Sequence, residues 1–425
     1  MRKMKETGIP WLPEVAEDFS VGYVKQYFYV SKDLSNEGEP ERVLKLARAG
    51  IVEKDVTTNE GQMAASYAGY NKVQVGDLLL NPMDLYSGAN CNVSELNGVI
   101  SPAYSNLRAK KAGSIVPKFY DYYFKCQYWL LAMFAHGKGV SFDNRWTLNN
   151  DSLRAYEIPV VPFAVQGHIV ERIQSEERKV DALIANMQAQ IEKLKAYKQS
   201  VITEVVIKGL DPTVPMKDSG VEWIGEIPEH WEITRIKNMF ELRNERNNEA
   251  DLSKVNLISL YTDLGVVQHS DITETTGNRA VTAEGYKFVH KDDIVVNIIL
   301  CWMGAIGMSK YDGVTSPAYD IYRPLEGTNS EYYHYLFRTN RFNGECYRYG
   351  RGIMMMRWRT YSTEFRAINI PCPPASEQKQ IVEYLNEKCG QIDRLISLKQ
   401  TKIEKLEQYK RSLIYEYVTG KREVC

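Results

Sequence analysis

The spacing of apolar residues changes within each half of this 425-residue chain. Short β-type runs come first, and a seven-residue spacing follows. Residues 1–155 contain short β-type runs, such as 21–24, 77–80 and 98–100, separated by Gly, Asn and Pro. From Gln166 to Lys208 apolar residues recur every seven positions, which predicts a long coiled-coil helix. The pattern predicts an α+β globule followed by a long helix, and it occurs twice.

The seven-residue spacing defines the expected seam of each helix. Its positions are Ile173, Val180, Met187, Leu194 and Val201 in the first helix, and Leu385, Ile392, Lys399, Leu406 and Leu413 in the second. Apolar neighbours, among them Leu183 and Tyr197, widen the stripe. Lys399 stands where the first copy has Met187, and it either fixes register and partner choice or extends past the seam into solvent. A helix of this length would span roughly 60 Å, and such a seam pairs most simply with its own copy.

The chain repeats itself with a shift of 212 residues. The segments that match at this shift are 8–12 with 220–224, 158–162 with 370–374, and 191–194 with 403–406. Inside the globules the shift grows to 215 for Ser-Pro-Ala-Tyr at 101 and 316, and to 216 for Asp77-Leu-Leu and Asp293-Ile-Val. Two equivalent surfaces on one chain suit a ligand with two similar halves, and duplex DNA is the commonest such ligand.

Composition and motifs exclude several functions. The net charge of −1 requires any DNA-binding face to be a local basic patch. The seven cysteines form no C-x-x-C pair, so the sequence predicts neither a disulfide framework nor a metal site. No phosphate loop, dinucleotide fingerprint, H-E-x-x-H or G-x-S-x-G is present, and the sequence predicts no catalytic residue. No apolar run reaches membrane length, and a cytoplasmic protein is expected.

A glycine-containing, basic and aromatic segment ends each globule, at 136–146 and 347–359. Arginine and lysine pair with phosphate, arginine can also fork onto guanine, and glycine lets the backbone approach phosphate closely. The alternative is a loop of solvated charges around a core tryptophan. The predicted DNA-binding residues are His136, Lys138, Arg145, Tyr347, Arg348, Tyr349, Arg351, Arg357 and Arg359.

Taken together, these motifs resemble the specificity subunits of Type I restriction–modification systems over the whole chain. The resemblance rests on the doubled Asp-Leu-Leu and Ser-Pro-Ala-Tyr motifs, the Ile-Pro-x-x-Pro straps, Glu377-Gln378-x-x-Ile381, and the segment 223–228. The first copy has Val165-Gln166 where the second has Glu377-Gln378.

The resemblance implies two pseudo-symmetric target-recognition domains, at 1–157 and 216–369. The spacer regions 158–215 and 370–425 would form an antiparallel coiled coil. Each domain would read one half of a split, asymmetric double-stranded DNA target. The helices would set the spacing and dock two methyltransferase (modification) subunits, and restriction (motor) subunits would join for cleavage.

The resemblance also implies that S-adenosylmethionine, ATP and Mg are bound by partner subunits, with no cofactor in this chain. Two alternatives stay open. The chain is either a coiled-coil scaffold whose globules bind proteins, or a stand-alone enzyme with an unrecognised site.

Overall fold

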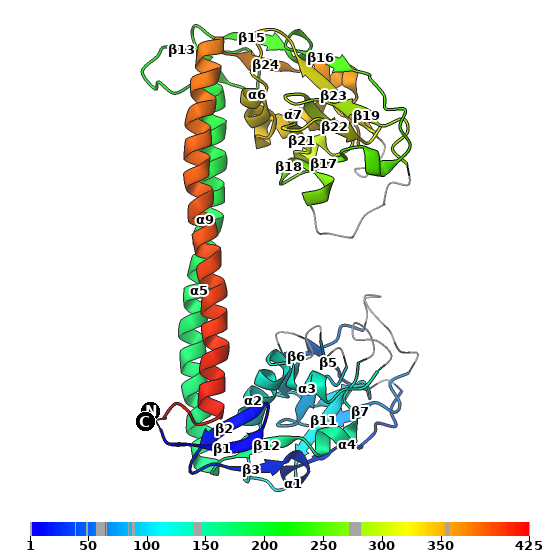
Figure 1. Cartoon of the computed structure of the whole chain (residues 1–425), viewed down its shortest axis with the longest axis vertical. Coiled ribbons are helices and arrows are strands. Elements are labelled where there is room, and N and C mark those ends of the chain that lie inside the picture. Colours follow the sequence, from blue (N-terminus) through cyan, green and yellow to red (C-terminus); the bar gives the residue numbers. More distant parts are fainter. Residues whose placement is uncertain are drawn as a thin grey trace. The chain divides into compact units, whose positions relative to one another are not determined.

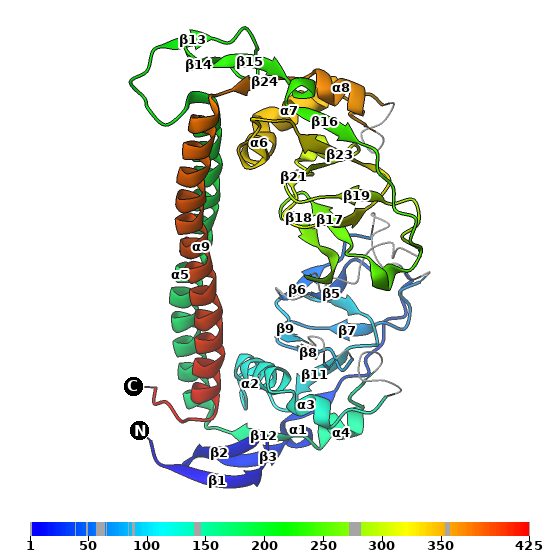
Figure 2. The same ribbon diagram turned by 45° about the horizontal axis from the view of Figure 1, so that its top comes forward.

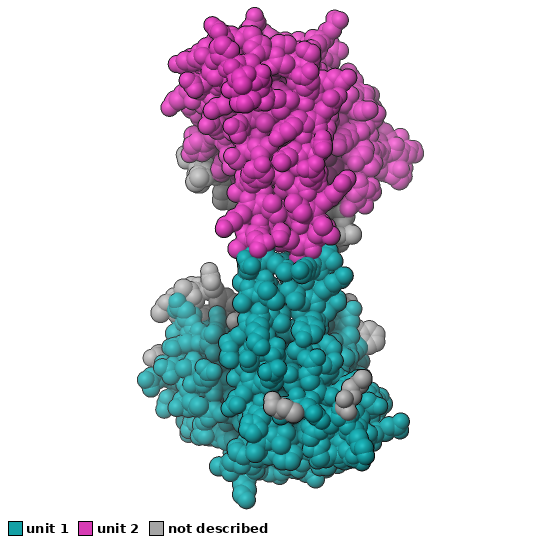
Figure 3. Space-filling model, turned by 90° about the vertical axis from the view of Figure 1, so that its left-hand side faces the viewer, with its two compact units in different colours: residues 1–187, 400–425 teal, residues 188–399 magenta. Residues whose placement is uncertain are grey.

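The computed structural model describes residues 2–424 except 39, 48–49, 57–63, 65, 84, 87–89, 140–145, 272–281 and 353–357. They form two compact units, residues 1–187 with 400–425, and residues 188–399 (Figure 3). Each unit holds one globule and one part of a helix pair (Figure 1). We call the globules globule 1 (residues 2–160) and globule 2 (residues 216–372). The predicted α+β class, with two domains and long joining helices, is confirmed.

Globule 1 is built from short strands in four sheets. The hairpin is β1 (Met4–Ile9) with β2 (Leu12–Ala16), and β3 (Ser20–Tyr23) pairs with β12 (Glu157–Val160). One four-stranded sheet has the order β4 (Phe28–Val30), β11 (Ser105–Ala109), β8 (Leu78–Leu80), β9 (Cys91–Val93). The other has the order β6 (Gly50–Glu53), β5 (Val43–Ala47), β10 (Gly98–Ile100), β7 (Asn71–Val73). The helices are α1 (Val24–Tyr27), α2 (Pro117–Trp129), α3 (Ala132–Ala135) and α4 (Asn150–Arg154).

Globule 2 repeats this topology. The hairpin is β13 (Met216–Asp218) with β14 (Glu226–Pro228), and β15 (Glu232–Arg235) pairs with β24 (Asn369–Cys372). The four-stranded sheet has the order β16 (Phe240–Arg243), β23 (Tyr319–Pro324), β20 (Ile294–Asn297), β21 (Ile306–Met308). Further pairs are β17 (Ile258–Tyr261) with β18 (Gly265–Gln268), and β19 (Lys287–Val289) with β22 (Gly313–Thr315). The helices are α6 (Ser330–Phe337), α7 (Asn340–Tyr349) and α8 (Ser362–Ala367), with 3-10 turns η1 (Ile236–Asn238), η2 (Leu252–Lys254), η3 (His269–Asp271) and η4 (Cys301–Met303).

The aromatic-rich, amphipathic sequence at 120–134 and at 332–342 predicts one helix in each globule, but the structure interrupts both helices. In globule 1 it breaks at Leu131, whose φ of 55° lies in the left-handed region and reverses the chain between α2 and α3. In globule 2 it breaks at Thr339, whose side chain caps the start of α7. Apolar spacing could not predict these breaks because both sides of each break contribute to the same core.

The predicted extended straps are strands. Pro159 in β12 and Pro371 in β24 lie inside two-stranded ladders, where proline has no N–H to donate. Their carbonyls instead accept from the hydroxyls of Tyr120 and Tyr333, at 3.2 and 3.4 Å. Each strap is therefore fixed to the aromatic helix of its own globule, immediately before the long helix begins.

The long helices are α5 (Phe163–Lys208) and α9 (Ala375–Val418), and they run antiparallel within each unit (Figure 2). In the first unit the Lys410 ammonium lies 2.7 Å from the Asp181 carboxylate. In the second unit Lys198 lies 2.7 Å from Asp393. Each of these residues is 212 positions from its counterpart, so the same ion pair occurs in both units.

The predicted seam is largely buried. Ile173, Val180, Val201, Leu385, Ile392 and Leu413 are buried, whereas Met187, Leu194, Lys399 and Leu406 are half-buried. Lys399 donates to the side-chain oxygen of Gln190 at 2.5 Å. This bond favours a role for Lys399 in the register of the pair. Among the described helices, none has an apolar stretch long enough to cross a membrane.

Both long helices end at a glycine that packs against an aromatic ring. Gly209 after α5 and Gly420 after α9 have φ of 77° and 75°, the left-handed conformation that terminates helices. A Cβ at Gly209 would lie 3.3 Å from Trp231, and a Cβ at Gly420 would lie 2.6 Å from Phe19. Trp231 and Phe19 are counterparts in the repeat. The helix of each copy therefore ends against the same site of the globule in its unit.

Candidate nucleic-acid interface

The two basic segments form loops that are closed at the base by a pair of backbone hydrogen bonds. Lys138 and Thr147 exchange N–H···O bonds of 2.9 and 3.0 Å in globule 1. Arg351 and Arg359 do the same in globule 2, at 2.8 and 3.0 Å. The loop tips lie outside the described residues, and they include the predicted DNA-binding residues Arg145 and Arg357.

A tryptophan and a glycine hold each loop in place. The indole N–H of Trp146 donates to the Phe134 carbonyl at 2.8 Å, and that of Trp358 donates to the Tyr347 carbonyl at 3.0 Å. A Cβ at Gly137 would lie 2.6 Å from the Trp146 ring, and one at Gly350 would lie 2.2 Å from the Trp358 ring. Only glycine fits at this distance. The contact that requires Gly137 and Gly350 is therefore with indole, whereas the sequence suggested phosphate.

An asparagine turn lies beside the base of each loop. The Asn81 side chain accepts from the Met83 N–H, and the Asn297 side chain accepts from the Ile299 N–H, both at 3.0 Å. The loop is bonded to this turn, because the N–H of Leu148 donates to the Pro82 carbonyl at 2.8 Å. Thr360 and Ile298 form the equivalent bond in globule 2, at 2.9 Å.

The Ser-Pro-Ala-Tyr motif forms a second turn on the neighbouring strand. In globule 1 the Tyr104 N–H donates to the Ser101 carbonyl at 3.1 Å, and the Ala103 N–H donates to the Ser101 hydroxyl at 3.3 Å. In globule 2 the corresponding distances from Ser316 are 3.0 and 3.3 Å. The proline and alanine of both turns are exposed.

The two turns lie together because they occupy the adjoining ends of neighbouring strands, and the clasped loop joins them through its hydrogen bond to the asparagine turn. Asn297 pairs with Tyr319 in the β20–β23 ladder, and β8 pairs with β11 in the same way. We call the set of described loop base, asparagine turn and Ser-Pro-Ala-Tyr turn the tripartite edge (residues 81–83, 101–104, 137–139 and 146–147; 297–299, 316–319, 350–352 and 358–359). The repeat of Ser-Pro-Ala-Tyr could be found in the sequence, but its adjacency to the basic loop could not, because that adjacency depends on the order of the strands in the sheet.

Several predicted DNA-binding residues lie at the base of a loop with an exposed or charged side chain. Lys138 is exposed, and Arg351 is 75% exposed and pairs with Glu364 at 3.2 Å. The backbone of Arg359 forms the hydrogen bonds with Arg351 that close the loop, and the Arg348 side chain pairs with Glu345 at 2.6 Å. Each pair leaves other guanidinium N–H groups of the arginine available to a ligand.

The aromatic side chains among the predicted DNA-binding residues pack mainly against other residues of their own globule. Tyr347 stacks on Trp358 with ring centroids 5.0 Å apart, and Arg348 lies over the ring of Tyr349 at 5.4 Å. His136 packs edge-on against Trp11 at 4.3 Å and also contacts Tyr156. This position gives His136 a packing role in globule 1.

A buried aspartate before β8 and before β20 stabilises the same sheet in both globules. Asp77 accepts from the Gln74 N–H, and Asp293 accepts from the His290 N–H, both at 2.9 Å. In globule 1 the charge partner is Arg108 from β11, at 2.7 Å. This hydrogen bond to Asp77 raises the pKa of Arg108, which stays charged.

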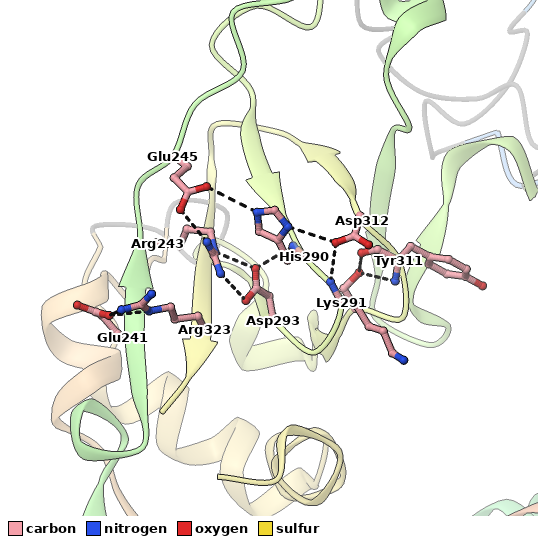
Figure 4. A network of polar contacts seen from close by, with 10 residues as sticks. Glu241, Arg243, Glu245, His290, Lys291, Asp293, Tyr311, Asp312 and Arg323 are labelled. Carbon is pink, nitrogen blue, oxygen red and sulfur yellow. Dashed lines mark hydrogen bonds and ion pairs between the residues drawn. The ribbon is translucent and has the colours of Figure 1, made fainter. Parts of the chain in front are cut away.

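In globule 2 the partner of Asp293 is Arg243 from β16, at 3.0 Å (Figure 4). Arg323, the counterpart of Arg108, pairs instead with Glu241. His290 lies between Glu245 and Asp312 at 3.6 and 3.2 Å, which extends the network across the surface (Figure 4). The carboxylate is thus kept while the source of its counter-charge differs.

Comparisons with known proteins agree with this architecture. Residues 228–408 match the family model of the Type I restriction modification DNA specificity domain. The Type I restriction enzyme MjaVIII specificity subunit of Methanocaldococcus jannaschii is 23% identical over 421 residues, covering 94% of this chain and 86% of that protein. The putative MjaX specificity subunit of the same organism is 24% identical over 292 residues, covering 66% of this chain and 63% of that protein.

Solved structures share the fold. A chain from a structure on complex assembly and conformational transition of the type I R-M system has a TM-score of 0.68 and 11% identity, covering 95% of this chain and 98% of that chain. The HsdS subunit from Thermoanaerobacter tengcongensis has a TM-score of 0.51 and 13% identity, covering 98% and 100%. Residues 228–408 therefore carry the DNA specificity domain of Type I restriction–modification systems, in agreement with the resemblance found in the sequence. This family implies a role in DNA recognition.

Proposed function

We propose that each globule reads one half of a split DNA target through its tripartite edge. This proposal rests on the presence of the tripartite edge in both globules. Two sets of turns and clasped basic loops share one hydrogen-bond geometry, while the loop residues differ. A constant support with variable loops suits a target whose two halves differ in sequence.

The paired helices also present matched apolar side chains that suit two copies of one partner. Leu183 and Tyr409 in the first unit are 49% and 47% exposed, and their counterparts Leu395 and Tyr197 in the second are 48% and 49% exposed. The sequence assigned these side chains to the apolar stripe, whereas about half of each is open to solvent. The Lys410–Asp181 contact shows that these segments of the two helices lie side by side, so Leu183 and Tyr409 are within about one turn of each other along the helix axis.

We infer that these two surfaces, Leu183 with Tyr409 and Leu395 with Tyr197, each dock one modification subunit. Exposed apolar patches on a soluble protein indicate a binding partner, and equal patches indicate equal partners. The chain itself would be non-catalytic. S-adenosylmethionine, ATP and Mg would be bound by the modification and restriction subunits.

The docking proposal is tested by subunit stoichiometry. Leu183→Ser with Tyr409→Ser should reduce the bound modification subunits from two to one in native mass measurements. Leu395→Ser with Tyr197→Ser should do the same, and all four changes should leave none. Lys193→Ser with Lys405→Ser, exposed counterparts on the same helices, is the matched control and should keep both subunits. Retention of both subunits in the fourfold variant would contradict the docking surface.

The reading proposal is tested by the salt and sequence dependence of binding by the assembled complex. Binding should be sequence-selective and should weaken steeply with salt, because phosphate contacts release counterions. Arg351→Ala should reduce discrimination at one half only, by ~1–3 kcal/mol if it contacts a base. Equal loss at both halves would assign Arg351 a structural role. Salt-insensitive binding without sequence preference would favour the protein-binding scaffold.

The spacing proposal is tested by changing the length of the helix pair. One heptad inserted after Lys198 and one at the antiparallel position near Asp393 would lengthen both helices together. The preferred gap between the half-sites should then change while both half-site sequences stay the same. An unchanged gap would show that the helices do not determine the spacing.

A further inference from the structure

A pocket of about 380 Å³ opens beside the tripartite edge of globule 1. Met83 of the asparagine turn and three residues of the Ser-Pro-Ala-Tyr turn line it on one side, and β5 and the residue after β6 line it on the other. Its volume is within the range of small-ligand sites, which starts near ~300 Å³. The pocket is too small for a duplex but large enough for one nucleotide.

The pocket combines an aromatic and apolar floor with two lysines. Tyr70 and Tyr104 contribute the rings, and Met83 and Ala64 add apolar surface. Lys45 and Lys54 also line the pocket. They lie on one face of the β5–β6 ladder, because the Lys54 N–H donates to the Val43 carbonyl and Lys45 is two residues from Val43. A phosphate contact would need only the lysines, whereas the aromatic and apolar side chains that share the pocket suit a planar ring.

The equivalent positions in globule 2 hold different chemistry. The tyrosines are kept, as Tyr286 and Tyr319. His269 replaces Lys54, since its N–H donates to the Leu257 carbonyl at 2.8 Å as that of Lys54 does to Val43. Ser259 then replaces Lys45, and its hydroxyl lies 3.0 Å from the His269 ring nitrogen. Globule 1 alone therefore carries two lysines at this place.

We propose that the pocket of globule 1 binds one unstacked nucleotide of the DNA target, with its base on the tyrosines and its phosphate on Lys45 and Lys54. This inference rests on the proposed DNA-reading function and adds a nucleotide site to one of the two globules. An unstacked base exposes both faces and its pairing edge, and aromatic side chains bind such faces with little sequence preference. Ser101 also lines the pocket, and its hydroxyl is a polar group that can bind the exposed edge of a base.

The test is to measure binding of the assembled complex to DNA targets that carry a single mismatch at each position in turn. Extrahelical binding costs the unpairing of one base, and a mismatch has already lost that pairing. For the assembled complex, a mismatch at one position of the half-site read by globule 1 should tighten binding by ~10-fold or more. A target adenine extruded toward a modification subunit would also respond, so each responding position must be assigned with pocket variants.

Lys45→Ser with Lys54→His converts the lysines to the residues of globule 2. These changes should abolish the mismatch gain at the pocket position and leave any gain at the methylated adenine. They should also reduce the slope of log affinity against log salt by ~1, as expected for about one lost phosphate contact. Tyr70→Ala should abolish the same gain, although it also removes a contact with Tyr67. The matched control, Ser259→Ala in globule 2, should change neither quantity.

Three results separate the possible failures. Sequence-selective binding with no mismatch gain that depends on Lys45 and Lys54 would overturn the nucleotide pocket and leave the reading function intact. A reduced salt slope without any mismatch gain would assign the lysines to the duplex backbone and likewise overturn the pocket. Loss of selective binding in the unaltered complex would overturn the reading function itself.

Discussion

Globule 1 and globule 2 have the same strand order but provide the charge partner of a buried aspartate in different ways. Asp77 is paired with Arg108 of β11, whereas Asp293 is paired with Arg243 of β16. The turn before the central strand requires the carboxylate in both copies, because backbone N–H groups donate to it. The buried carboxylate is paired with a guanidinium in both globules, and either the adjacent strand of the sheet or the strand beyond it can supply that group. Both globules therefore contain a buried aspartate paired with an arginine, but the arginine comes from a different strand in each.

The strongest test of this comparison is to remove the arginines one at a time. Arg108→Ala should destabilise globule 1 by ~3–5 kcal/mol, because the buried Asp77 carboxylate would be left without a counter-charge. Arg323→Ala at the equivalent position should cost under ~1 kcal/mol, because its pair with Glu241 is exposed. Hydrogen exchange in β8 and β20 of the full chain measures both effects. Similar losses for the two variants would contradict the exchange of partners, and Arg243→Ala should match Arg108→Ala.

A Cβ at Gly137 or Gly350 tests whether the two clasps are equivalent. Each alanine variant would overlap the indole of its clasp, more severely at Gly350, where the contact would be 2.2 Å. We expect a cost of ~1–3 kcal/mol from overpacking and a loss of affinity confined to one half-site. Binding to targets altered in either half checks this. Gly344→Ala, on α7 with no atom near its Cβ position, is the control.

A histidine in globule 2 predicts that the two units respond differently to acid. Burial lowers the pKa of His334 in α6 from its ordinary 6.5 to about 3, and its ring nitrogen accepts from the Met308 N–H. The counterpart in α2 is Asp121, which pairs with Lys118 and Lys125. Because the folded pKa of His334 is depressed, its stabilising effect is present above pH 6.5 and is lost as the pH falls toward 3.

Hydrogen exchange of α6 and α2, corrected for intrinsic rates, measures this response. Protection of α6 should decline between pH 7 and pH 5, and His334→Gln, which keeps an acceptor but does not titrate, should remove that decline. An unchanged pH response in His334→Gln would assign the acid sensitivity to other groups.

The smallest expected effect concerns the repeated ion pair of the helices. Asp393→Asn and Asp181→Asn should each cost only ~0.2–1 kcal/mol, because the pairs are partly exposed. The two coupling energies should agree when measured by double-mutant cycles with Lys198→Met and Lys410→Met. Clearly unequal couplings would show that the two halves of the helix pair are not equivalent environments.

The sequence predicted the parts of the fold that depend on regular spacing. The heptads, the straps and the repeat itself could be predicted because each involves a local pattern or sequence identity. The left-handed break at Leu131 and the Arg351–Glu364 pair were not, since they depend on packing between distant segments. The site was predicted only in part. The basic loops could be found, but their neighbours in the tripartite edge become adjacent only when β8 and β11, or β20 and β23, pair.

The most direct test of two globules reading two halves is methylation of a random DNA library by the assembled complex, followed by mapping of the modified adenines. We expect one motif of two different short sequences separated by an unread gap, with adenine methylated in each half. Arg351→Ala should relax one of the two sequences and leave the other unchanged. A single continuous motif, or relaxation of both sequences together, would contradict the assignment of one half to each globule.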